Sequence, residues 1–218
     1  MNEGTRWIAF ASSALAFLAY EGWSIWLGRR HPERLARSTH ARMRVSWVAA
    51  LGRQPGFEIV AVQALRNSLM SATIAASTAA LALVATVTLA SGNIASTVAS
   101  GKTTARAVLE ILLMACLFAS YVCSAMAMRY FSHAGFVMSM PVTAPEREPL
   151  NPMAAEYVER AGLLYSWGLR FFLMVAPLVA GIVSWLAMPP MTAALIAVMW
   201  FFDRPPRMLA TGAPALNK

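Results

Sequence analysis

The residues of this sequence that are best placed to do chemistry lie on one polar stripe. The stripe consists of Gln63, Arg66, Asn67, Thr73 and Ser77. On a helix these positions share one face, because residues three and four apart are neighbours. The stripe starts at a cation and fades to hydroxyl groups, so inside a membrane it could line an anion path or hold a lipid headgroup. The alternative is a structural arginine that joins helix ends through carbonyls, carboxylates or lipid phosphate.

A second polar set lies in the last third of one long apolar segment and at the start of the next. It consists of Arg129, His133, Glu156, Arg160 and Arg170. Glu156 and Arg160 are four residues apart, which is the spacing of a helical ion pair. We expect long helices to bring this set together as a collar on the cytoplasmic side. The collar is either part of a site or a salt-bridged rim with a structural role.

The sequence lacks the patterns that mark most enzymes. No serine or cysteine stands in a nucleophile elbow, and no glycine-rich phosphate loop is present. The three histidines, His31, His40 and His133, are scattered without metal-ligand spacing. We therefore predict no enzymatic activity, no metal site and no cofactor.

Composition indicates a membrane protein. Hydrophobic residues make up 58% of the 218 residues and charged residues only 13%. Soluble domains average about 45–50% apolar and about 25% charged residues, so lipid must cover part of this surface. The net charge of +8 comes from residues between the apolar segments, which favours anionic phospholipid headgroups over nucleic acid as a partner.

The apolar segments predict an all-α fold, a polytopic transmembrane helical bundle with four or five membrane helices. We expect long segments at 7–27, 59–91, 105–140 and 151–188, with a turn at 93–104 and a kink at Pro177. Gly92-Asn93 should end the second segment and Pro189-Pro190 the fourth. A last piece, 191–202, is short for a crossing unless neighbouring residues from Leu186 contribute. Segments longer than the bilayer core should extend into the cytosol.

We expect one transmembrane domain over residues 1–203 and a short polar tail over 204–218. The domain includes a basic loop at 28–58 and a proline-rich loop at 141–152. Positive residues concentrate in cytoplasmic loops, so the basic loop should be cytoplasmic and the N-terminus periplasmic. The composition, rich in arginine and alanine, points to the inner membrane of a bacterium.

The basic loop contains a possible amphipathic helix, 41–51, with Met43, Trp47 and Ala50 on one face and Arg42 and Arg44 beside them. This helix could lie on the membrane surface. It could instead pack on the bundle as a cytosolic helix. Small residues recur every fourth position on the second segment, from Ser68 through Ala72 and Ala76, as they do where membrane helices approach closely. Such a pattern serves self-association or packing within one chain.

The run Gln63-x-Leu65-Arg66-Asn67-Ser68-x-Met70 resembles the signature of the uncharacterised domain-of-unknown-function family 599 of membrane proteins. The stretch from Arg129 to Phe136 and Asp203 after the last apolar segment resemble the same family. The likeness spans roughly residues 7–203. It implies a polytopic membrane protein and makes Gln63, Arg66 and Asn67 the residues to test first, but it implies no activity.

Two functions remain open at this point. The first is an oligomeric channel or transporter for a small anionic solute, with a path lined by the polar stripe. The second is a non-catalytic membrane scaffold or accessory subunit that binds anionic lipid or a partner membrane complex. A homo-oligomer fits the first hypothesis, and a larger complex fits the second.

Overall fold

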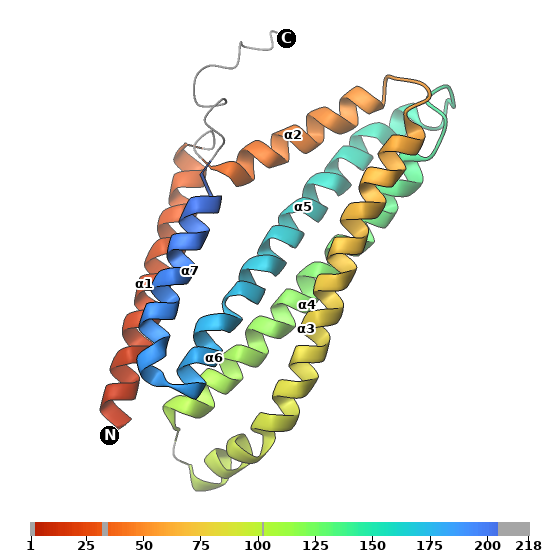
Figure 1. Cartoon of the computed structure of the whole chain (residues 1–218). Helices are drawn as coiled ribbons and strands as arrows, with labels where there is room; N and C mark the ends of the chain where they lie inside the picture. Colours follow the sequence, from red (N-terminus) through yellow and green to blue (C-terminus); the bar gives the residue numbers. More distant parts are fainter. Residues whose placement is uncertain (1–2, 32–34, 102, 205–218) are drawn as a thin grey trace. The chain divides into compact units, whose positions relative to one another are not determined.

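The computed structural model describes residues 3–31, 35–101 and 103–204 (Figure 1). These residues form helices joined by short turns, and no strand occurs among them. The α-helices are α1 (Glu3–Arg30), α2 (Ala36–Leu51), α3 (Glu58–Ser100), α4 (Ala105–Met138), α5 (Asn151–Leu173), α6 (Val175–Val183) and α7 (Met188–Phe202), with 3-10 turns at Glu148–Leu150 and Trp185–Ala187. The predicted positions in the tail beyond Arg204, and those at Arg34 and Lys102, lie outside the described residues.

The predicted all-α membrane fold is confirmed. Within the described ranges, five helical segments are long and apolar enough to cross a membrane. Large apolar side chains on them point outward, for example Leu15, Leu89 and Val183, which are 71%, 85% and 81% exposed. Water would disfavour such a surface and lipid would not. The fifth segment, Trp185–Phe202, has 18 residues because the 3-10 turn extends the short apolar piece backward.

Helix α3 is longer than the sequence predicts, and the expectation that Gly92-Asn93 ends it is wrong. The helix runs for 43 residues, about 65 Å at 1.5 Å per residue, to Ser100. The Asn93 side chain donates to Glu110 at 2.7 Å and so does not compete with the helix backbone. Gly101, with φ +64°, ends the helix in the left-handed conformation that glycine adopts readily.

The kink expected at Pro177 is present, whereas Pro189-Pro190 acts at another position than expected. The helix breaks at Met174, three residues before Pro177, because the proline ring clashes with the carbonyl four residues earlier, at Leu173. Pro189-Pro190 does not stop a helix. The two prolines stand in the first turn of α7, where the missing N–H groups have no helical partner to lose. The preceding helix ends earlier, at Val183.

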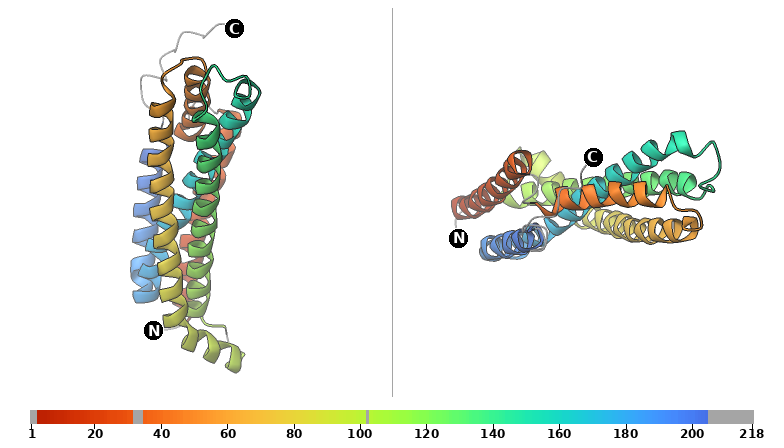
Figure 2. Two further views of the ribbon diagram at one scale, coloured as in Figure 1. Left: turned by 90° about the vertical axis from the view of Figure 1, so that its right-hand side faces the viewer. Right: turned by 90° about the horizontal axis from the view of Figure 1, so that it is seen from above.

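The chain divides into two units, each described by itself. Unit 1 comprises residues 1–40, 86–113 and 173–218, and unit 2 comprises residues 41–85 and 114–172. In unit 1, α1 and α7 lie side by side (Figures 1 and 2). Their contact is centred on Tyr20, Leu195 and Met199. The Tyr20 hydroxyl donates to the Asp203 carboxylate at 2.8 Å, and the Ala36 N–H donates to the Asp203 carbonyl at 3.0 Å.

Unit 2 packs parts of four helices around small and aliphatic side chains. Its core contains Val48 and Leu51 of α2, Ala61, Leu65 and Ala72 of α3, Ala127, Phe131, Ala134, Val137 and Met138 of α4, and Ala154, Val158 and Ala161 of α5. The alanines let the helices approach closely, and Ala72 of the predicted small-residue stripe is one of them. This core holds the side chains of the candidate site in place.

Candidate functional site

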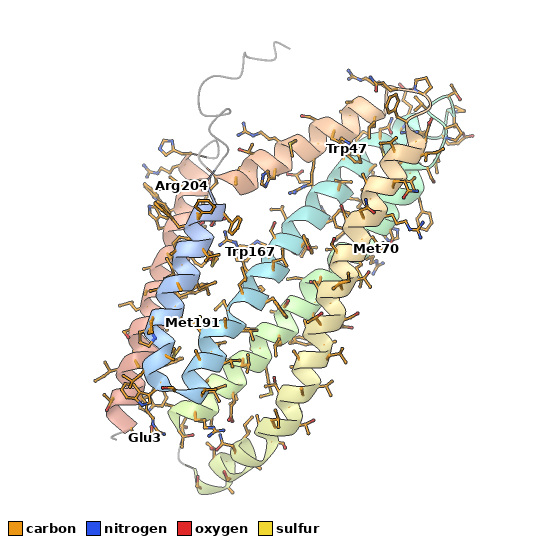
Figure 3. The ribbon with its side chains drawn as sticks, viewed as in Figure 1. Glu3, Trp47, Met70, Trp167, Met191 and Arg204 are labelled. Atoms are coloured by element: carbon orange, nitrogen blue, oxygen red, sulfur yellow. The ribbon has the colours of Figure 1, made fainter. Side chains whose placement is uncertain are left out.

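The most distinctive feature of unit 2 is a cavity of about 330 Å³, which we call the Arg44 cavity. It is lined by Arg44 and Trp47 of α2, Ala64, Leu65, Ser68 and Ser71 of α3, Phe131 of α4, and Val158, Gly162, Tyr165 and Ser166 of α5. Trp47 is labelled on α2 in Figure 3. One cation and several hydroxyl groups therefore meet on otherwise apolar walls, which is the usual composition of a binding site for a polar headgroup or small ligand.

Arg44 is the only charged side chain among the described residues that line the cavity. Its Nε is buried and has no hydrogen-bond partner within the described residues. Burial lowers the pKa of the Arg44 guanidinium, and the charge of Glu159 raises it in part. Arginine nevertheless keeps its positive charge at any physiological pH. Because this donor is charged, buried and without a partner, it favours a ligand that carries a hydrogen-bond acceptor, above all an anion.

Gly162 makes room for Arg44. A Cβ atom at position 162 would overlap the guanidinium group of Arg44. Glycine costs a helix roughly 1 kcal/mol relative to alanine, so its use in the middle of α5 has a packing reason here. The two residues are far apart in the sequence and form one feature only in the fold.

The hydroxyl groups of the cavity differ in what they offer. Ser68 donates to the Ala64 carbonyl and Ser71 to the Asn67 carbonyl, both at 3.1 Å, so each presents lone pairs to the cavity. Tyr165 and Ser166 are not engaged in this way within the described part of the chain. Their hydroxyl groups are free to donate to the same anion as Arg44.

Helix α2 places Arg44 by packing on unit 2. Its buried face carries Val48, which is 1% exposed, and Leu51, and Arg44 lies one turn before Val48. Of the predicted face, Met43 and Ala50 are exposed, whereas Trp47 is partly buried and lines the cavity. Packing on the core, the alternative for this helix, is therefore what the structure shows. The helix also begins earlier than predicted, at Ala36.

Arg147 joins the proline-rich loop, 141–152, to the start of α3. Its side chain is 1% exposed, and its guanidinium donates to the Met140 carbonyl and lies 3.8 Å from the Glu58 carboxylate. Glu58 also accepts the Val142 N–H at 3.0 Å. These contacts join the start of α3 to the proline-rich loop between α4 and α5. They fix three of the elements that carry the cavity.

The predicted polar stripe lies on the outside of α3. Gln63, Arg66, Asn67, Thr73 and Ser77 are all exposed, on the same face as the labelled Met70 (Figure 3). Thr73 donates to the Leu69 carbonyl at 2.9 Å and lies 3.0 Å from the Met128 sulfur. The stripe therefore does not line a path within unit 2. A path shared between copies of the chain stays a prediction.

The predicted collar forms only in part. Arg160 pairs with Glu156 and lies near Tyr130 of α4. Tyr157 stacks on Tyr130 and on His133, with ring centroids 5.7 and 5.6 Å apart. His133, Glu156 and Arg160 therefore gather around two tyrosines that the sequence reasoning did not single out. Arg129 is exposed on α4. Arg170 lies ten residues beyond Arg160, about 15 Å along α5, beside Trp167.

A family model described as "Protein of unknown function, DUF599" matches residues 8–208. The chain belongs to the DUF599 family. The resemblance seen in the polar run at Arg66 is thereby confirmed. No curated protein and no solved structure matches the chain.

In this DUF599 protein the three stretches that carry the resemblance have different surroundings. The run around Arg66 is outward-facing, with Leu65 buried beneath it. The stretch from Arg129 to Phe136 supplies Phe131 to the Arg44 cavity and His133 to the tyrosine cluster. Asp203 joins α1 to α2 through Tyr20 and Ala36. Sequence reasoning missed Arg44 and Gly162 as site residues, since Arg44 is one of seven arginines in the basic loop.

Proposed function

We propose that this DUF599 protein is a non-catalytic integral membrane scaffold that binds the headgroup of an anionic phospholipid in the Arg44 cavity. The observation that carries the proposal is the buried Nε of Arg44, which has no hydrogen-bond partner among the described residues and belongs to a cavity of about 330 Å³. Hydrogen bonds from a cation to a phosphate oxygen are about twice as strong as neutral ones, and arginine can make two in parallel.

Four further features support a headgroup as the ligand. The Tyr165 and Ser166 hydroxyls can donate to the phosphate oxygens that Arg44 leaves free. Ser68 and Ser71 present lone pairs, which suit hydroxyl groups such as those of a glycerol headgroup. The walls of Leu65, Phe131 and Val158 suit the first carbons of the lipid. The basic loop adds long-range attraction for an anionic membrane surface.

The test compares two arginines on the same helix. Arg42 is exposed and Arg44 lines the cavity, so Arg42→Ala and Arg44→Ala remove the same charge from positions two residues apart in α2. Each variant is placed in nanodiscs of phosphatidylcholine, and binding of phosphatidylglycerol is measured by native mass spectrometry. We expect Arg44→Ala to weaken binding at least tenfold, the equivalent of about 1.4 kcal/mol, and Arg42→Ala to change it less than twofold.

Two results would contradict the proposal. Equal losses in the two variants would mean that the basic loop attracts anionic lipid diffusely, without a site. Unchanged phosphatidylglycerol binding in Arg44→Ala would mean that the headgroup does not bind in the Arg44 cavity. Thermal unfolding of both variants in detergent serves as the control for folding. A separate arm with inorganic phosphate shows whether a free anion competes with the lipid at millimolar concentration.

A second function, an oligomeric channel or transporter for a small anionic solute, is favoured by one observation. The five stripe residues all face outward from one side of α3, where a second copy could cover them. Amide side chains such as Gln63 and Asn67 form hydrogen bonds between membrane helices. Flux of a radiolabelled anion into proteoliposomes tests it, with Arg66→Ala against the exposed loop variant Arg53→Ala. Equal flux in these two variants, or no flux in the wild type, would refute this function.

A further inference from the structure

Ser13 of α1 is an unusual serine for an apolar helix. Its side chain is 4% exposed, and its Oγ has no hydrogen-bond partner within the described residues. Serines in such helices normally donate to a carbonyl three or four residues back. The neighbouring Ser12 does so, to the Ala9 carbonyl at 3.0 Å. Ser13 therefore holds a buried donor that the protein itself leaves unused.

Ser13 lines two cavities of unit 1, which we call the Ser13 cavities. The larger, about 450 Å³, lies against α1 and α7 and is lined by Ser12, Ser13, Ala16, Pro189, Thr192, Ala193, Ile196, Ala197 and Trp200. The smaller, about 210 Å³, is lined mainly by large apolar side chains of α1, α6 and α7, among them Phe10, Phe17, Pro177, Leu178 and Met188. Ser13 and Thr192 belong to the lining of both cavities.

Thr192 cannot take the same role. Its hydroxyl donates to the Met188 carbonyl at 2.9 Å, and its side chain is also 4% exposed. Its hydrogen is thus committed within α7, and it presents only lone pairs. Of these two hydroxyl groups, Ser13 Oγ is the one without a hydrogen-bond partner among the described residues.

The chemistry of the walls defines the ligand class. The described residues that line the Ser13 cavities include no ionisable side chain, so a charged ligand would lose its hydration without compensation. The other lining side chains are mostly apolar, so they suit the hydrocarbon part of a ligand. From these observations we infer that the Ser13 cavities bind a neutral lipophilic molecule whose carbonyl oxygen accepts a hydrogen bond from Ser13 Oγ. Long-chain esters and quinones share this chemistry. The inference concerns unit 1 and does not rest on the headgroup proposal.

The experiment isolates the hydrogen bond with a matched pair of probes. A long-chain ketone labelled with ¹³C at the carbonyl is compared with the alkane of equal length, on the purified full-length protein in detergent. We expect the ketone to bind about fivefold more tightly than the alkane, the ratio that one neutral hydrogen bond gives. Its carbonyl stretching band should move to lower frequency on binding, which a hydrocarbon pocket without a donor would not cause.

Variants of the two adjacent serines test the assignment. Ser13→Ala should abolish both the affinity ratio and the shifted band, whereas Ser12→Ala should leave both unchanged. Ser13→Thr retains a hydroxyl and should restore the shifted band. Equal affinity of the wild type for ketone and alkane would overturn the inference. A shifted band that persists in Ser13→Ala would overturn it too, since another donor would then be responsible.

Competition distinguishes the two natural sources. A long-chain methyl ester and a decyl quinone are each titrated against the bound ketone in wild-type protein. If one of these two compounds displaces the ketone, its chemical class is that of the natural ligand. Displacement by neither overturns the inference of a carbonyl site. Arg44→Ala serves as the reference, because it should weaken headgroup binding and leave ketone binding unchanged, so the two proposals fail separately.

Discussion

The Arg44 cavity and the Ser13 cavities differ in the kind of polar group that they contain. Arg44 brings a full charge to its cavity, and the charge of Glu159 raises the Arg44 pKa that burial lowers. Ser13 brings a neutral donor to walls on which the described residues carry no charged side chain. The first arrangement should select ligands by charge, and the second by shape and one hydrogen bond. Variants and conditions that act on charge should therefore affect one region and spare the other.

Gly162→Ala should give the largest effect, because it removes the space that the guanidinium occupies. We expect phosphatidylglycerol binding in nanodiscs to fall at least tenfold, although no charge is changed. Gly135→Ala is the matched control, since a Cβ atom at Gly135 of α4 meets no atom within 4 Å. Ketone binding at Ser13 should not change in either variant. Equal lipid binding in the two glycine variants would show that the position of Arg44 is unimportant.

Ionic strength should give the next largest effect. Raising salt from 50 to 500 mM shortens the Debye length to less than half and screens partly exposed charges. We expect lipid binding measured in liposome co-sedimentation to weaken roughly fivefold, because Arg44 is only half-buried. Ketone binding should be unchanged, since no charge faces the Ser13 cavities among the described residues. Salt-sensitive ketone binding would contradict the contrast between the two regions.

Glu159→Gln should strengthen lipid binding, because it removes the carboxylate that interacts with the Arg44 charge. An interaction between partly exposed charges is worth about 0.2–1 kcal/mol, so the expected gain is roughly two- to threefold. Glu156→Gln is the control, since the exposed Glu156 pairs with Arg160 rather than with Arg44. The same native mass spectrometry titration measures both. Weaker binding in Glu159→Gln would mean that Glu159 orients Arg44 for the ligand.

The membrane segments could be predicted from the sequence because their length and apolar content decide them. The long crossings were therefore placed correctly, and the uncertain fifth segment needed only the extra turn at Trp185–Ala187. The end of α3 is harder to predict, since the Asn93 side chain donates to Glu110 of α4 and the helix continues to Ser100. Such partners come from other helices, and local sequence rules do not contain them.

The site residues could not be predicted in the same way. The polar stripe was read correctly as one face of a helix, but only the packing shows that this face is outward. Arg44 looked like any arginine of a basic loop until Gly162, more than 100 residues away, was seen to make room for it. Ser13 likewise looks like Ser12 in the sequence. Its hydrogen-bond partner, or the lack of one, depends on how α1 and α7 pack.

Thr192→Val should give the smallest effect, and it tests which hydroxyl acts in the Ser13 cavities. The change keeps the shape of the side chain and removes a hydroxyl that already donates to the Met188 carbonyl. We expect ketone affinity in the infrared titration to change less than twofold, against about fivefold for Ser13→Ala. If Thr192→Val abolished the shifted carbonyl band while Ser13→Ala kept it, Thr192 would be the donor. The contrast with Arg44 would survive that outcome, because the cavity would still select a neutral ligand through one hydroxyl group.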